Sequence, residues 1–212
     1  MRKCFDPDFS HYKQSLRVID ILENDGKGLN LTREVVDGII NHKMSSNPKT
    51  LEGKAVSLAD RIAYINHDID DAIVGGFIKK EDLPKDVIEI LGDTSSKRIN
   101  KMVHSIYVES DGKNKVEMEP HVFEATHKLR SFMFERVYTV SALKREEERA
   151  DRMITTLYEY FKKHENELPE FFIKERLRCD LDTVLCDYIS GMSDGFVVKI
   201  FNDIFVPKNW KL

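Results

Sequence analysis

The amino-acid sequence predicts an all-α protein, and three observations support this. Ten glycines and six prolines in 212 residues are too few for the closely spaced turns of an all-β chain. Apolar residues recur at helical spacing along most of the chain. Capping residues precede several of these periodic runs. Because 41% of the residues are hydrophobic, a sizeable core can form, and we expect a single all-helical domain over residues 1–212.

Two helices are expected in the first quarter of the chain. The first runs from Ser10 to Asp25, with Ser10 as the N-cap, and Gly26 and Gly28 end it. Its buried side is predicted to carry Leu16, Val18, Ile19 and Leu22. The second begins after Thr32, which stands at a capping position, and its helical face carries Val35, Val36, Ile39 and Ile40.

The segment from Gly53 to Gly76 is predicted to be one long central helix closed by two glycines. A loop rich in Ser, Asn and Pro, from Met44 to Pro48, separates it from the preceding helix. Apolar residues at helical spacing form a stripe wide enough to bury against a core, and they are Leu58, Ile62, Ile65, Ile69, Ala72 and Ile73.

Helices continue beyond the central helix. The pattern predicts a short helix with the sequence DVIEILG, a helix capped by Ser95 or Ser96 that runs to about Val108, and long helices over Pro120–Tyr138 and from Ser141 to Lys163. A last helix is expected from Leu181 to about Phe205, before Pro207, with Trp210 packing the tail onto the domain.

Composition and charge exclude several classes of protein. The 33 basic and 37 acidic residues give a formal charge of −4, which provides no footprint for nonspecific binding to nucleic acid or to an anionic membrane. No apolar run approaches the roughly 20 residues that a membrane span needs. Three cysteines, Cys4, Cys179 and Cys186, lack zinc-type spacing and favour a reducing compartment. We therefore expect a soluble, cytoplasmic protein without a membrane or nucleic-acid partner.

The second face of the central helix is polar. Spacings of three, four, seven and eight residues superpose on a helix, so this face carries Asp60, Tyr64, His67, Asp68 and Asp71, with Arg61 at its edge. Like charges this close repel one another by some tenths of a kcal/mol per pair. One interpretation is an ordinary solvated face, and the other is a site that binds a cation.

The run ADRIAYINHDIDDA, which spans this face, resembles the signature helix of the deoxyguanosinetriphosphate triphosphohydrolase-like family, a branch of the HD superfamily of metal-dependent phosphohydrolases. Similar motifs occur in the family's order, namely FSHYKQSLRVIDILE, GLNLTREVVDGIINH, TLEGK, CDYISGMSD and FVPKNW. The resemblance implies a partial HD-domain-like helical bundle with a C-terminal helical extension. Residues 1–92 would be the remainder of the HD core, and residues 93–212 would pack on it.

The resemblance also implies an activity and a set of site residues. The family hydrolyses deoxynucleoside triphosphates to a deoxynucleoside and tripolyphosphate with a divalent metal, and Mn²⁺ or Mg²⁺ is expected here. By this resemblance Asp60 is a metal ligand, Tyr64 and Asp68 line the deoxyribose pocket, and Arg61 meets the phosphates. Arg61 could equally pair with Asp68 or Asp71. His11 matches a histidine near the phosphates and is the candidate catalytic residue.

The chain departs from the family pattern in two ways. Tyr12 and Lys13 replace the usual Asn and Glu after His11, and the family's first metal-binding His and its His-Asp pair precede the segment that this chain resembles. We therefore expect the C-terminal two-thirds of the enzyme, truncated and impaired alone, and partnered by further copies of itself or by an upstream HD-bearing polypeptide. The alternatives are a noncatalytic oligomerisation or regulatory module, the partner half of a split enzyme, or a phosphohydrolase acting on another phosphate ester.

Overall fold

The computed structural model describes Phe5 and residues 9–43, 46–139 and 141–208, without the side chains of residues 141–143. Within these ranges every regular element is helical, so the predicted all-α class is confirmed. No helix in the same ranges is long and apolar enough to cross a membrane. Cys4 and the predicted packing of Trp210 lie outside the described residues.

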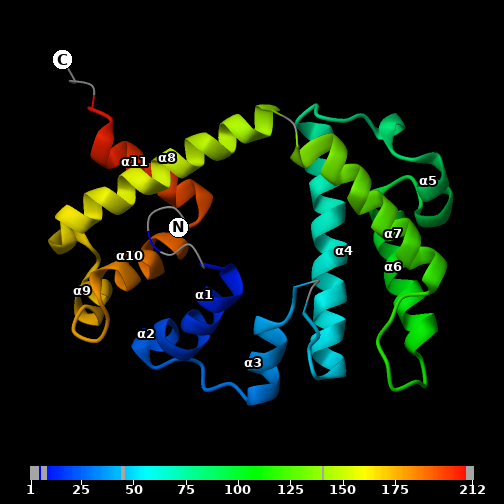
Figure 1. Ribbon diagram of the computed structural model, residues 1–212, viewed down its shortest axis with the longest axis horizontal. Coiled ribbons are helices and arrows are strands. Elements are labelled where there is room, and N and C mark those ends of the chain that lie inside the picture. Colours follow the sequence, from blue (N-terminus) through cyan, green and yellow to red (C-terminus); the bar gives the residue numbers. More distant parts are fainter. Residues whose placement is uncertain (1–4, 6–8, 44–45, 140, 209–212) are drawn as a thin grey trace. The chain divides into compact units, whose positions relative to one another are not determined.

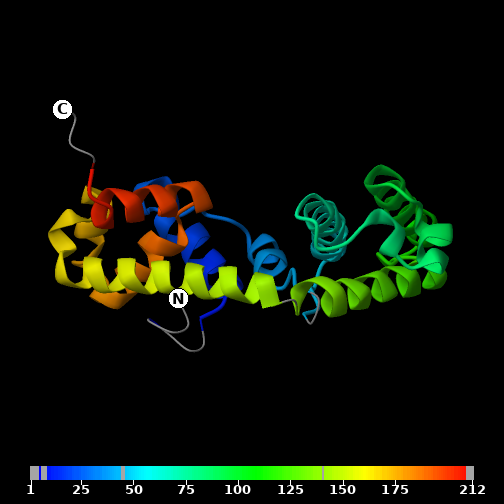
Figure 2. The same cartoon turned by 90° about the horizontal axis from the view of Figure 1, so that it is seen from above.

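The chain forms two compact units (Figures 1 and 2). Unit 1 combines Met1–Asn30 with Arg145–Leu212, and unit 2 is the continuous segment Leu31–Lys144. The N-terminal helices therefore share a unit with the C-terminal ones. This grouping does not coincide with a boundary after residue 92, and the assembly of residues 1–92 and 93–212 into one domain stays a prediction.

Unit 2 is built around the long helix α4, drawn in cyan in Figure 1. Its elements are α3 (Arg33–Ile40), α4 (Leu51–Val74), the 3₁₀ turn Lys80–Asp82, α5 (Lys85–Leu91), α6 (Ser95–Ser110), α7 (Pro120–Met133) and the π-helical continuation η3 (Phe134–Tyr138). The apolar stripe of α4 packs into the core as predicted, except for the half-buried Leu58 at its start. Its fully buried members lie with Met102, Leu129 and Met133, and they include Ile62, Ile65, Ile69 and Ala72.

Threonine side chains cap three helices of unit 2. Thr32 caps α3 as predicted, and the Thr50 hydroxyl accepts a hydrogen bond from the Gly53 backbone N–H at 3.0 Å to start α4. The predicted cap of α6 was wrong by one residue, because Thr94 accepts from the Lys97 N–H and Ser95 already lies inside the helix. Thr94, Ser95 and Ser96 all carry a hydroxyl that can cap a helix, so the sequence alone did not show which of them is the N-cap.

Two glycines allow α3 and α4 to approach closely. A Cβ atom built on Gly53 would lie 3.3 Å from the Gly38 Cα and 2.7 Å from the Pro48 Cβ. The second distance is too short for a real contact, so Gly53 has to lack a side chain here. The N-terminal half of α4 is thereby held against α3.

Unit 1 contains the remaining helices. They are α1 (His11–Arg17), the π-helical η1 (Val18–Leu22), α2 (Glu23–Gly26), the part of α8 (Ser141–Lys163) from Arg145, a 3₁₀ turn (Glu165–Glu167), α9 (Glu170–Glu175), α10 (Leu181–Ser190) and α11 (Asp194–Phe205). Its core is centred on side chains of α8 and α10, among them Leu157, Tyr158, Phe161, Val184 and Leu185. Helix α9 was not predicted.

The first predicted helix is shorter than expected. Ser10 does precede α1, but its side chain makes no capping hydrogen bond. Asn24 and Asp25 adopt left-handed backbone angles, with φ of 55° and 56°, so the helix ends before them. Asn and Asp tolerate this conformation better than most residues. Gly28 is required next, because a Cβ there would lie 2.4 Å from the Asp20 carbonyl oxygen.

The last predicted helix is two helices. Helix α10 ends at Ser190, and α11 begins after Ser193, whose side chain accepts a hydrogen bond from the Phe196 backbone N–H. Gly191 is the C-cap of α10. A glycine followed two residues later by a serine is a stop signal and a start signal in succession, and the expectation of one continuous helix was wrong for that reason.

Candidate functional site

The polar side chains predicted for the central helix line one face of α4, opposite its buried stripe. Asp60, Tyr64 and His67 are exposed, and Asp68 and Arg61 are half-buried. Asp68 is hydrogen-bonded to a side chain of η3, and Arg61 lies in the electrostatic field of Arg130 on α7; these two side chains define the candidate site.

The first contact joins α4 to η3. The Tyr138 hydroxyl donates a hydrogen bond to the Asp68 carboxylate at Oδ2. The Tyr64 ring lies beside the Tyr138 ring, with centroids 6.4 Å apart, and it is 54% exposed. Burial raises the pKa of Tyr138, and its hydrogen bonds with Asp68 and Tyr64 raise it further. Tyr138 therefore keeps its proton at neutral pH and orients the carboxylate beside an exposed aromatic ring.

The second feature is a half-buried arginine that feels the charge of another arginine. Burial lowers the pKa of Arg61, the positive charge of Arg130 on α7 lowers it further, and the carboxylate of Asp60 opposes both. The Arg61 Nε is buried and has no hydrogen-bond partner. In the described part of the chain neither guanidinium lies within ion-pair distance of a carboxylate. A guanidinium without a salt bridge and with a buried Nε that has no acceptor is suited to binding an anion.

Asp60 is exposed one residue before Arg61. Among the residues that the structure describes, no group of three or more His, Cys, Asp or Glu side chains is arranged to hold a metal ion. A catalytic transition metal takes about three protein ligands. The side chains present therefore do not fit a divalent metal by themselves, and Asp60 could supply one ligand of such a site.

His11 belongs to unit 1, whereas the α4 residues belong to unit 2. Its side chain is exposed at the start of α1, and its ring meets that of Tyr12 edge to face, with centroids 5.7 Å apart. The Ser15 hydroxyl donates to the His11 carbonyl oxygen at 2.9 Å. A catalytic role for His11 stays a prediction.

Sequence reasoning missed Tyr138 and Arg130 as site residues. Both lie on the helical stretch from Pro120, eight residues apart, outside the apolar stripe that buries this stretch. Spacing of eight places them on one face, with Phe134 between them. This polar and aromatic face was a usable signal, but nothing in the pattern indicated that it meets α4.

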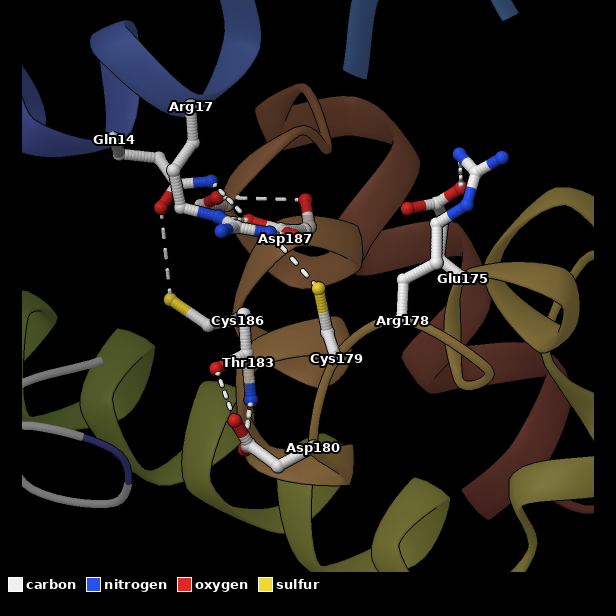
Figure 3. A network of polar contacts seen from close by, with 10 residues as sticks. Gln14, Arg17, Glu175, Arg178, Cys179, Asp180, Thr183, Cys186 and Asp187 are labelled. Atoms are coloured by element: carbon white, nitrogen blue, oxygen red, sulfur yellow. Dashed lines mark hydrogen bonds and ion pairs between the residues drawn. The ribbon is translucent and has the colours of Figure 1, made fainter. Parts of the chain in front are cut away.

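The motifs FSHYKQSLRVIDILE and CDYISGMSD meet in unit 1 through a buried polar network (Figure 3). Arg17 binds Asp187 with two hydrogen bonds, Nε to Oδ1 at 2.8 Å and Nη2 to Oδ2 at 2.5 Å. The Gln14 amide donates to Oδ1 at 2.7 Å. The Asp187 side chain is 2% exposed. These motif residues therefore hold α1 against α10.

The chain is similar in sequence to proteins named as phosphohydrolases. Residues 116–203 match the family model described as "Phosphohydrolase-associated domain". A protein of Caldanaerobacter subterraneus subsp. tengcongensis named "Deoxyguanosinetriphosphate triphosphohydrolase-like protein" is 47% identical over 99% of this chain and 62% of its own length. Proteins with the same name from Clostridium tetani and Desulfatibacillum aliphaticivorans are 42% and 30% identical, over 94% and 98% of this chain and 60% and 64% of their own lengths. The chain thus spans less than two thirds of these relatives.

Proposed function

Because the chain is a relative of the deoxyguanosinetriphosphate triphosphohydrolase-like proteins over nearly its whole length, we propose that it carries the substrate-binding face of a deoxynucleoside triphosphate triphosphohydrolase. The observation that carries the proposal is the pairing of Asp68 with Tyr138 on the face of α4 that also carries Arg61, whose pKa is lowered by the charge of Arg130 on α7. This face combines one acceptor, aromatic surface and positive charge, which are the three features that a nucleotide needs.

The sugar is proposed to lie at Tyr64 and Asp68. A carboxylate held by the Tyr138 hydroxyl still has lone pairs that can accept from a sugar hydroxyl. The exposed Tyr64 ring offers apolar surface beside it, and a ring packed under the sugar leaves no room for a 2′-hydroxyl. Deoxyribose would therefore be preferred over ribose.

The phosphates are proposed to lie at Arg61 and Arg130. Each guanidinium can donate two parallel hydrogen bonds to a phosphate, and the anion would relieve the repulsion between the two side chains. Fixed cations also stabilise the negative charge that a polyphosphate leaving group carries during hydrolysis.

The divalent metal of the family would add Lewis-acid activation of the phosphoryl group when it is bound. Asp60 is proposed as one of its ligands, and the described side chains of this chain do not complete the set. The proposal for this chain therefore concerns binding and orientation of the substrate. Hydrolysis at full rate would require ligands from another polypeptide or from further residues.

The proposed setting is the cytoplasm, and the proposed assembly is a homo-oligomer or a complex with an HD-bearing polypeptide. Large apolar side chains remain exposed on α11, among them Phe196 and Val198, and such surface favours association.

The proposal is tested by calorimetric titration of the purified chain with dGTP and with GTP. We expect dGTP to bind more tightly than GTP, and Asp68→Asn to weaken dGTP binding about tenfold, because a hydrogen bond to a charged acceptor is lost. Tyr64→Ala should reduce the preference for dGTP over GTP. Release of tripolyphosphate in Mn²⁺ or Mg²⁺, with each deoxynucleoside triphosphate, is measured in parallel.

Tyr107→Ala is the matched control, because Tyr107 is a 64% exposed tyrosine on α6 of the same unit. It should leave both affinities unchanged. Tight binding of GTP, or an Asp68→Asn variant that binds dGTP as the parent chain does, would contradict the proposal. Binding without turnover would identify the chain as a binding part that needs a partner for hydrolysis.

A further inference from the structure

A groove of about 820 Å³ follows the outer face of α8 in unit 1. Eight of its lining residues lie on α8 between Glu148 and Lys163, a stretch about 22 Å long at the usual rise of a helix. The opposite face of this helix, with Leu157 and Phe161, packs into the core of the unit, and α11 packs beside it (Figure 1). None of the groove residues belongs to the proposed nucleotide site, so the groove is a separate feature of the chain.

Four charged side chains of the groove are exposed and form no ion pair among the residues that the structure describes, namely Glu148, Arg152, Glu159 and Lys163. Each carboxylate stands four residues before a cation, a spacing at which a helix can pair them. Outside the groove, Glu146 and Arg149 of the same helix do pair, at 2.7 Å. The groove charges are thus left for water or for a second molecule, and their order distinguishes between the two.

The order of these charges is symmetric about the midpoint between Thr155 and Thr156. A second copy of α8, turned end for end about this midpoint, would place each lining residue of the helix opposite another lining residue. The pairs are Glu148 with Lys163, Arg152 with Glu159, Asp151 with Tyr160, and Thr155 with Thr156. Both charge pairs join a carboxylate to a cation and occur twice, and no like charges stand directly opposite one another. A two-fold dimer interface requires a surface that is complementary to itself in this way.

Aromatic side chains form one end of the groove. The Tyr160 ring stacks on the His164 ring with centroids 4.3 Å apart, and the Phe205 ring meets Tyr160 edge to face at 5.4 Å. Phe205 is 38% exposed. In a two-fold dimer one such aromatic group would lie at each end of the paired helices and add apolar contacts. This addition matters, because exposed ion pairs alone contribute little to association.

We propose that α8 pairs antiparallel with α8 of a second copy of this chain through the groove. The inference rests on the homo-oligomer named in the proposed function and assigns a surface to it. It needs neither a nucleotide nor the side chains of Arg61 and Asp68, so it can fail separately from the proposed substrate site. Two helix faces of this length form a small interface, and we expect a weak dimer with a dissociation constant on the order of 10 µM.

The experiment is sedimentation equilibrium of the whole chain over a range of concentrations. Arg152→Glu places like charges opposite each other at two points of the dimer, and we expect it to weaken association at least about tenfold. Glu159→Arg should do the same. The double variant Arg152→Glu/Glu159→Arg exchanges the two charges and should restore the dissociation constant to within about threefold of the parent value. Because the double variant has the net charge of the parent chain, restoration would not come from net charge.

Lys199→Glu is the matched control, since Lys199 is exposed on α11 of the same unit, lies outside the groove and undergoes the same change of charge. It should leave the dissociation constant unchanged, and thermal unfolding by circular dichroism confirms that each variant folds. The inference is overturned if the chain stays monomeric up to about 100 µM, a concentration well above the expected constant. A dimer that Arg152→Glu does not weaken, or that the double variant does not restore, would also overturn it, because association would then use another surface.

Calorimetric titration of the same samples with dGTP separates this inference from the proposed substrate site. A monomeric chain that binds dGTP more tightly than GTP would overturn the dimer and leave the substrate site standing. A dimer that follows the expected charge pattern and binds no dGTP would support the α8 interface and contradict the substrate site.

Discussion

In unit 1 the buried carboxylate of Asp187 accepts hydrogen bonds from Gln14 and Arg17, whereas in unit 2 the half-buried guanidinium of Arg61 has no salt bridge among the described residues, and the charge of Arg130 disfavours it further. The first cluster satisfies its charges with partners from the chain itself. In the second cluster the buried Nε of Arg61 has no hydrogen-bond acceptor. A satisfied buried network stabilises one arrangement of helices, while an unsatisfied one is typical of a site that awaits a ligand.

The largest expected effect comes from breaking the satisfied network. Asp187→Asn removes the negative charge that Arg17 binds with two hydrogen bonds. It also replaces one acceptor oxygen with an NH₂ donor that would face the donors of neighbouring side chains. We expect a loss of about 3 kcal/mol in the free energy of unfolding, at the lower end for a broken buried pair because the Arg17 side chain is 28% exposed. Urea denaturation followed by circular dichroism measures it.

The control for this change is Asp203→Asn, because Asp203 is exposed on α11 and forms no ion pair in the described part of the chain. It should change the free energy of unfolding by less than about 0.5 kcal/mol. If Asp187→Asn behaved like this control, the network of unit 1 would contribute little to stability, and the contrast between the units would disappear.

A smaller change in the free energy of unfolding is expected when the hydrogen bond between Tyr138 and Asp68 in unit 2 is removed. Tyr138→Phe removes the donor to Asp68, and we expect a loss of about 1 kcal/mol, because the group is only half-buried. The pKa of Tyr138 is raised in the folded chain, so its contribution is complete below the ordinary tyrosine pKa of about 10 and declines as the pH rises above that value.

The difference in urea midpoint between the parent chain and Tyr138→Phe should therefore be constant from pH 7 to 9 and shrink above pH ~10. Tyr107→Phe, which changes an exposed tyrosine of α6, should leave the midpoint unchanged. A difference that grows with pH above ~10 would show that Tyr138 does not hold its proton as the contact with Asp68 requires.

Local pattern predicted the elements well and the contacts between them poorly. The central helix was expected over Gly53–Gly76 and spans Leu51–Val74, because its apolar period and its closing glycines act within the segment itself. The polar face followed from the same geometry. Tyr138, however, lies 70 residues from Asp68, and a periodicity carries no information about such a partner.

The network of unit 1 was beyond sequence reasoning for the same reason. Gln14 and Asp187 are separated by 173 residues, and each stands on a helix whose pattern indicates only that its face is partly buried. The break after Ser190 was predictable in principle, since Gly191 and Ser193 are a helix stop and a helix start. The expected helix from Leu181 to about Phe205 ran through both signals.

The smallest expected change in the free energy of unfolding is an increase instead of a loss, and it distinguishes the Arg61 site of unit 2 from the Asp187 network of unit 1 most directly. Arg61→Met removes a charge that burial and Arg130 disfavour, together with the unmade Nε donor, and it keeps an unbranched chain for packing. We expect the free energy of unfolding without ligand to rise by about 0.5 kcal/mol, after allowance for solvent screening. Binding of dGTP and of tripolyphosphate should weaken in the same variant.

Arg136→Met is the matched control, because Arg136 is exposed on η3 and has no carboxylate within ion-pair distance among the described residues. It should change neither stability nor binding. Removing a side chain that holds the fold together lowers the free energy of unfolding. Removing one that is kept for a ligand weakens ligand binding and raises the free energy of unfolding. A loss of 1 kcal/mol or more in Arg61→Met would therefore place Arg61 with Asp187, among the residues that hold the helices together.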